Sequence, residues 1–164
     1  MIDLIKERLE EYGTQDPVQK QYAVKEILQE IALFGLWKTG FFEYAAFQGG
    51  SSLRILYGMP RFSEDLDFIL KQPDPGFEWS AYLNGMTACF ETFGLTVEIL
   101  DKSRMDQRIK KALLKNDSTG LQLNLTFARE RLQKIQKIKF EIDVNPPEHS
   151  LFNYTYIEKK GGCN

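Results

Sequence analysis

The sequence contains one histidine, His149, and two cysteines, Cys89 and Cys163, among 164 residues. A single histidine excludes histidine-rich metal sites, and it excludes Ser-His-Asp catalysis unless His149 itself takes part. The position of His149 after a proline pair is more typical of a surface residue. The two cysteines have no metal-binding spacing and form no disulfide framework. We expect Cys89, inside a predicted helix, to be a small buried apolar residue.

Long apolar runs are also missing. The longest, Ile31–Trp37, contains Gly35 and is followed by Lys38, whereas a membrane-spanning helix needs ~20 apolar residues. The N-terminal segment 1–13 mixes charges of both signs with spaced apolar residues, which is not the pattern of a signal peptide. We therefore expect a cytoplasmic protein that has no membrane partner.

The composition is that of an ordinary globular protein, with 43% hydrophobic and 27% charged residues, and it excludes disordered, collagen-like and coiled-coil chains. A domain averages ~150 residues, so the length favours a single domain over residues 1–164. We expect N-terminal helices over about residues 1–40, a sheet core over about 41–147 and a short tail over 148–164.

Charge is distributed unevenly along the chain, although the net charge is only −2. Residues 1–100 contain 8 Lys and Arg against 15 Asp and Glu, whereas residues 101–139 contain 11 against 4. A basic segment can contact phosphate-bearing partners such as RNA. It can equally be a solvated surface whose charges meet the acidic half of the fold, and the sequence leaves both interpretations open.

Hydrophobic periodicity predicts helices and strands in mixed order. The predicted helices cover residues 2–11, 17–37, 51–57 and 78–93. The predicted strands cover residues 44–47, 66–70, 96–100 and 138–144. Segments 108–114 and 121–127 fit either a strand or a helix. This order predicts an α+β fold, with a mixed sheet, flanking helices and a helical N-terminal segment.

A glycine- and serine-rich loop, Gly49-Gly50-Ser51-Ser52, lies between a predicted strand and a predicted helix. Glycines let the backbone approach a ligand closely, and a helix N-terminus offers free N–H groups to phosphate. Taken alone, such a loop is more often a turn followed by a serine N-cap.

Two short acidic segments are the other candidates for a functional site. Asp65 and Asp67 would point to the same face of a strand, with Cα atoms roughly 6.5–7 Å apart. Such close carboxylates repel each other unless a cation lies between them, and Mg²⁺ favours oxygen ligands. Glu141 and Asp143 share the polar face of a later strand, so alternation does not choose between them as a third ligand.

Together these pieces match the needs of nucleotidyl transfer, which uses two metal ions ~3.5–4 Å apart, held by carboxylates. Each piece alone is better explained by ordinary structure: a turn, an acidic strand start and an amphipathic strand. The ordered combination is what favours the functional interpretation.

Several segments resemble the AbiEii-like nucleotidyltransferases, the toxins of type IV toxin–antitoxin and phage abortive-infection systems in the polymerase-beta-like superfamily. The resemblance extends from about Gln19 to Pro147. Its motifs are FFEYAAFQGGSSLR (residues 41–54), Tyr57-Gly58, RFSEDLDF (residues 61–68) and KFEIDVNPP (residues 139–147).

The resemblance implies that the protein transfers a nucleoside monophosphate from a nucleoside triphosphate to an acceptor, with Mg²⁺ or Mn²⁺ as cofactor. The implied partners are tRNA or another RNA as acceptor and an antitoxin protein. The implied metal ligands and catalytic residues are Asp65, Asp67 and Asp143, with Glu141 as the alternative third acid. The implied triphosphate-binding residues are Gly49, Gly50, Ser51, Ser52 and Arg61.

Members of the family usually continue into a helical region with a Lys-rich helix and an Arg-Asp motif, and this sequence contains no such region. The alternative expectation is therefore a truncated module that binds a nucleotide or a partner but does not catalyse transfer. A third interpretation is a nucleic-acid-binding module that acts through the basic segment and whose affinity falls steeply with salt.

Overall fold

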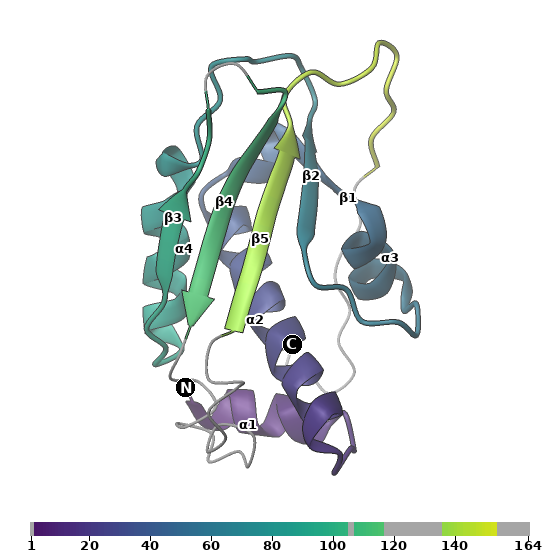
Figure 1. Cartoon of the computed structure of the whole chain (residues 1–164), viewed down its shortest axis with the longest axis vertical. Helices are drawn as coiled ribbons and strands as arrows, with labels where there is room; N and C mark the ends of the chain where they lie inside the picture. The colour runs from purple at the N-terminus through teal and green to yellow at the C-terminus, as the bar shows by residue number, and fades with distance from the viewer. Residues whose placement is uncertain (1, 105–106, 117–135, 154–164) are drawn as a thin grey trace.

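The computed structural model describes residues 2–104, 107–116 and 136–153 (Figure 1). The helices are α1 (Ile2–Glu10), α2 (Pro17–Lys38), the 3-10 helix η1 (Phe41–Glu43), α3 (Gly49–Tyr57) and α4 (Ser80–Thr92). The strands are β1 (Ala45–Gln48), β2 (Leu66–Leu70), β3 (Glu98–Asp101), β4 (Ile109–Asn116) and β5 (Gln136–Asp143). This mixture confirms the predicted α+β class.

The strands form one mixed sheet in the order β1-β2-β5-β4-β3. The central strands β2 and β5 are parallel, while the other neighbouring strands pair antiparallel. Helices α2 and α4 lie behind the sheet in Figure 1, and α3 lies beside β1 and β2 at one edge. No described helix lies over β4 and β5 on the other side, which we call the open face.

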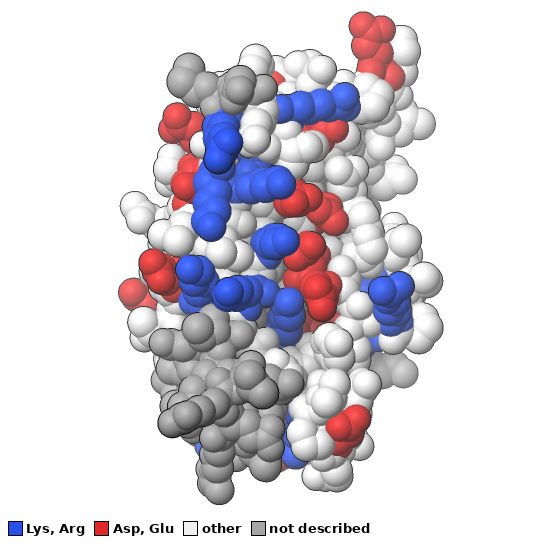
Figure 2. All heavy atoms as spheres, in the orientation of Figure 1, with Lys and Arg blue, Asp and Glu red and all other residues white. Residues whose placement is uncertain are grey.

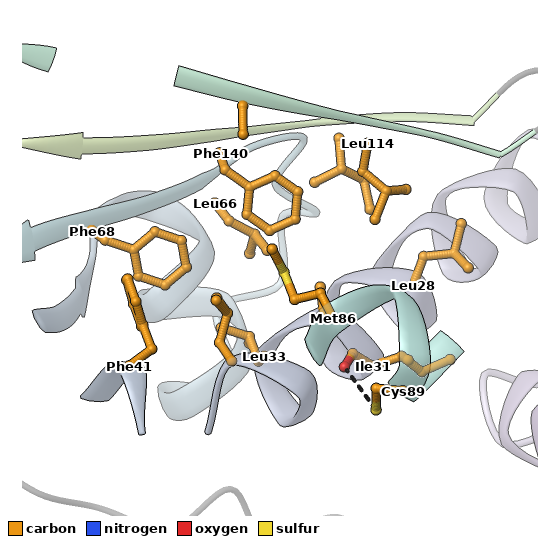
Figure 3. Packing of buried hydrophobic residues seen from close by; sticks show 14 of the residues in the cluster. Leu28, Ile31, Leu33, Phe41, Leu66, Phe68, Met86, Cys89, Leu114 and Phe140 are labelled. Atoms are coloured by element: carbon orange, nitrogen blue, oxygen red, sulfur yellow. Dashed lines mark hydrogen bonds between the residues drawn. The ribbon is translucent and has the colours of Figure 1, made fainter. Parts of the chain in front are cut away.

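The core lies between the sheet and its helical layer. Alternate residues of β2 and β5 are buried, as their period-two pattern predicts. Figure 3 shows Phe140 and Leu114 from the sheet above Met86 of α4, and Phe68 facing Phe41. Helices α2 and α4 pack closely because Gly35 has no side chain: a Cβ there would lie 3.0 Å from the Cα of Met86.

Predictions about two segments and two single residues can be compared with the structure. Of the ambiguous segment 108–114, residues 109–114 belong to strand β4, and the helix predicted over 51–57 begins two residues earlier, at Gly49. Cys89 is buried, as expected, and His149 is exposed. Segment 121–127 and Cys163 lie outside the described residues. Across the described part of the chain, every helix is too short or too polar to span a bilayer.

A buried ion pair fixes α3 against α2. Arg54, in the last turn of α3, donates from Nε to Glu26 Oε2 at 2.8 Å and from Nη2 to Oε1 at 3.3 Å. The Glu26 side chain is only 6% exposed, and it also accepts a hydrogen bond from the Tyr12 hydroxyl at 2.8 Å. Arg54 donates to the carbonyl of Met59 as well and lies 4.3 Å from the centre of the Phe62 ring. One guanidinium thus connects three segments that surround the start of β2.

We expect Arg54→Met to lower the free energy of unfolding by about 3–5 kcal/mol, because Glu26 would stay buried without its cation. The double variant Arg54→Met/Glu26→Gln should recover part of that loss, since it removes both charges. Urea unfolding measures the difference. The control Arg61→Met, at an exposed position, should change stability by no more than about 0.5 kcal/mol. Equal losses for the single and double variants would contradict this account.

Candidate functional site

Strands β2 and β5 bring two acidic side chains side by side. Asp67 is the direct partner of Glu141 in the parallel register. Both point to the open face, because the flanking residues in each strand are buried in the core. Asp65, one residue before β2, lies two residues from Asp67 and therefore on the same side. The register thus places Asp65, Asp67 and Glu141 near one another.

These carboxylates repel each other. The pKa of Asp67 is raised above its usual value by burial, and also by the negative charges of Glu141 and Asp65. Lys111 Nζ lies 3.8 Å from Glu141 Oε1, and the Lys111 side chain is 54% exposed. Such a group of carboxylates favours a bound cation, which would relieve the repulsion.

Asp143 lies two residues beyond Glu141 along β5, opposite Ile69. Its Oδ1 accepts hydrogen bonds from Arg108 Nε at 2.9 Å and from the backbone N–H of Asn145 at 2.9 Å. Burial alone would raise the pKa of Asp143, but these bonds and the Arg108 charge hold it below its usual value. The sequence left Glu141 and Asp143 as alternatives for the third carboxylate of the site. In the structure Glu141 lies beside Asp67, whereas Asp143 forms an ion pair with Arg108.

The glycine loop meets the acidic group directly. Gln48, the last residue of β1, is the register partner of Asp67, so α3 begins beside that side chain. Gly49 has a φ of +78°, and a Cβ at this position would lie 2.8 Å from Asp67 Oδ2. The Asp67 carboxylate thus fills the space that any other side chain at position 49 would occupy. Glycine is needed here for both its conformation and its size.

The two serine hydroxyls bind the protein's own backbone. Ser51 is fully buried, and its Oγ donates to the carbonyl of Asp65. Ser52 Oγ donates to the carbonyl of Gly49 at 2.8 Å. Gln48, at the N-cap of α3, donates its amide to the carbonyl of Phe68 and makes no capping hydrogen bond. The first-turn N–H groups of α3 consequently have no side-chain cap and are the available donors for an anion.

Arg61 and Gln29 lie near the loop that precedes Asp65. Arg61 is exposed and forms no ion pair with any residue that the structure describes. Gln29 is fully buried in α2 and donates from Nε2 to the carbonyl of Ser63 at 2.9 Å, which holds this loop in place. The sequence analysis missed Gln29 and Arg108. A lone polar residue within the apolar stripe of a helix was a usable signal for Gln29. Arg108 was noted only as part of the basic segment, and nothing in the sequence marked it as the partner of Asp143.

The donor set fits a hard divalent cation, because the site contributes only carboxylate oxygens. Within residues 2–104, 107–116 and 136–153, however, no three His, Cys, Asp or Glu side chains lie close enough together to hold a metal ion. The register brings the acids to adjacent positions without closing them into a cage.

A family model described as "Nucleotidyl transferase AbiEii toxin, Type IV TA system" matches residues 31–160. The match covers more than half of the chain, and it includes the glycine loop, the Asp65–Asp67 pair and strand β5. No curated protein and no solved structure matches the chain.

We expect Gly49→Ala to destabilise the protein more than Gly94→Ala. Both glycines have a φ of +78°, so each alanine is strained by about 1–2 kcal/mol. A Cβ at Gly94 meets nothing within 4 Å, whereas one at Gly49 collides with Asp67. Urea unfolding of the two variants isolates the collision. Equal losses would show that Asp67 moves aside freely.

Replacing Asp67 or Asp143 with asparagine should have opposite effects on thermal stability. The raised pKa of Asp67 means that its ionisation destabilises the folded state, so Asp67→Asn should raise Tm at pH 7. The lowered pKa of Asp143 means the reverse, so Asp143→Asn should lower Tm at pH 7. Both differences should shrink as the pH falls through the carboxyl range, about 3.9 for an unfolded Asp. Shifts of the same sign at pH 7 would refute this assignment.

Proposed function

Because the chain belongs to the AbiEii nucleotidyltransferase toxin family of type IV toxin–antitoxin systems, we propose that it is a metal-dependent nucleotidyltransferase. It transfers a nucleoside monophosphate from a nucleoside triphosphate to an acceptor, with tRNA as the candidate acceptor. The observation that carries the proposal is the contact between the start of α3 at Gly49 and the carboxylate of Asp67. That contact places the N-terminus of α3, whose N–H groups could bind a phosphate, beside an acidic group.

In this proposal the first-turn N–H groups of α3 bind the triphosphate, and Gly49 and Gly50 let it approach the backbone. The exposed side chain of Arg61 adds positive charge near the phosphates. Ser51 and Ser52 act by holding the loop, since their hydroxyls donate to carbonyls of Asp65 and Gly49.

Asp65 and Asp67 would hold Mg²⁺ or Mn²⁺. The third ligand is Glu141, which the register supports, or Asp143, which would first have to release Arg108. When bound, the metal would stabilise negative charge on the attacking and leaving oxygens. The acceptor hydroxyl oxygen forms a bond to the α-phosphorus, the bond from that phosphorus to the β-phosphate oxygen breaks, pyrophosphate leaves, and the hydroxyl proton passes to solvent.

A transfer assay tests the proposal. The protein is incubated with each α-labelled nucleoside triphosphate, with Mg²⁺ or Mn²⁺, and with tRNA or total RNA. We expect label to reach the RNA with the wild-type protein and at least 100-fold less label with Asp67→Asn. Glu91→Gln, on the exposed side of α4, removes a negative charge away from the site and should retain activity.

Calorimetry with the four nucleotides separates this function from the alternative. Binding of a nucleotide without any labelled product would support the inactive nucleotide-binding module and overturn the enzyme. No binding and no product would remove both. As a member of a toxin–antitoxin family the protein is also expected to have an antitoxin, whose coexpression should relieve any growth arrest that the active protein causes.

A further inference from the structure

Four lysines gather on the open face beside the acidic group. Residues Ala112, Leu114, Ile138 and Phe140 of β4 and β5 are buried in the core, so the residues that alternate with them point to the open face. Among them are Lys111, Lys115, Lys137 and Lys139, which we call the lysine face. Figure 2 shows blue side chains over β4 and β5, beside a red stripe toward β2.

The register leaves much of this positive charge uncompensated. Lys115 is the direct partner of Lys137, and like charges in this position repel each other. Lys139 lies opposite the apolar Leu113. Glu98 lies opposite Lys115 on the outer side, and only Lys111 among the four has a described carboxylate within 4 Å. An amphipathic strand explains polar residues on this face, but it does not explain why those of β4 and of the first half of β5 are all lysines.

The lysines also lie in line with the candidate site. Along β5 the residues on the open face are Lys137, Lys139, Glu141 and Asp143, each step spanning roughly 6.5–7 Å. Lys139 is therefore one step from Glu141, which is the register partner of Asp67. A polyanion that binds the lysines would lie along β5. The carboxylates of Glu141 and Asp143 repel it, so it would end beside them.

We propose that the lysine face binds the backbone phosphates of the acceptor, an RNA strand, and directs the end of that strand toward Asp67 and Glu141. This inference rests on the proposed function and adds to it a binding surface. Repulsion from the acids stops the phosphate backbone at the edge of the site, so that a terminal hydroxyl, which carries no charge, is the group that enters. The repulsion between Lys115 and Lys137 is offset when a phosphate lies between them.

The test compares two variants that remove the same charge. Lys137→Gln/Lys139→Gln changes the lysine face, while Lys6→Gln/Lys38→Gln changes exposed lysines in α1 and α2. Binding of a single-stranded RNA oligonucleotide is followed by fluorescence anisotropy over a range of salt concentrations. Each phosphate contact on a single strand contributes ~0.7 to the slope of log K against log salt. We expect the first variant to lower the magnitude of that slope by about 1.4 and to weaken binding at least tenfold, and the second to match the wild type.

Three further measurements complete the test. No RNA binding by the wild type, equal losses of affinity in both variants, or equally tight binding of polyglutamate would overturn the proposed surface.

Two controls separate the surface from the candidate site. Calorimetric nucleotide binding should be unchanged in Lys137→Gln/Lys139→Gln. Asp67→Asn should still bind RNA although it transfers no label. If the wild type transfers no label to RNA but the salt slope still depends on Lys137 and Lys139, then nucleotidyl transfer fails while the binding surface stands.

Discussion

The parallel pairing of β2 with β5 determines where every charged group of the open face lies. Leu66, Phe68, Phe140 and Ile142 fix this register, because a slip by one residue would turn them all toward water. The same pairing sets Asp67 against Glu141 on the opposite side of the sheet. Apolar burial on one face of the sheet therefore imposes electrostatic repulsion on the other. The folded chain tolerates this repulsion because burial of the core stabilises it by far more free energy than the repulsion between two half-exposed carboxylates costs.

The start of α3 depends on the sheet as much as on its own sequence. Gln48, the last residue of β1, is the register partner of Asp67, and its side-chain amide donates a hydrogen bond to the carbonyl of Phe68. The Ser51 hydroxyl donates a hydrogen bond to the carbonyl of Asp65. At the other end of the helix, the pair formed by Arg54 and Glu26 secures α3 to the helical layer. The loop is thereby held at both ends before any ligand binds. If the loop binds a triphosphate as we propose, such preorganisation would reduce the entropy lost on binding.

Local patterns were sufficient to predict several elements but not their pairing. The strand Leu66–Leu70 was predicted with its observed bounds, because hydrophobic alternation and a following turn delimit it. The family resemblance is confirmed over residues 31–160. Segment 108–114 was ambiguous because its lysines are compatible with the solvent-exposed face of either a strand or a helix. The choice between Glu141 and Asp143 could not be made because both share one face of β5, and only the long-range register with β2 distinguishes them. The roles of these acids, of the glycine loop and of Arg61 stay predictions.

The sheet ends on both sides in short strands, β1 and β3, each of four residues, whereas β4 and β5 have eight. A short border presents few unpaired amide and carbonyl groups, so it is a poor template for a strand from a neighbouring molecule. Growth of the sheet by addition of another chain is accordingly disfavoured, even at high protein concentration. In the proposed binding mode, the RNA contacts the broad charged surface rather than the rim of the sheet.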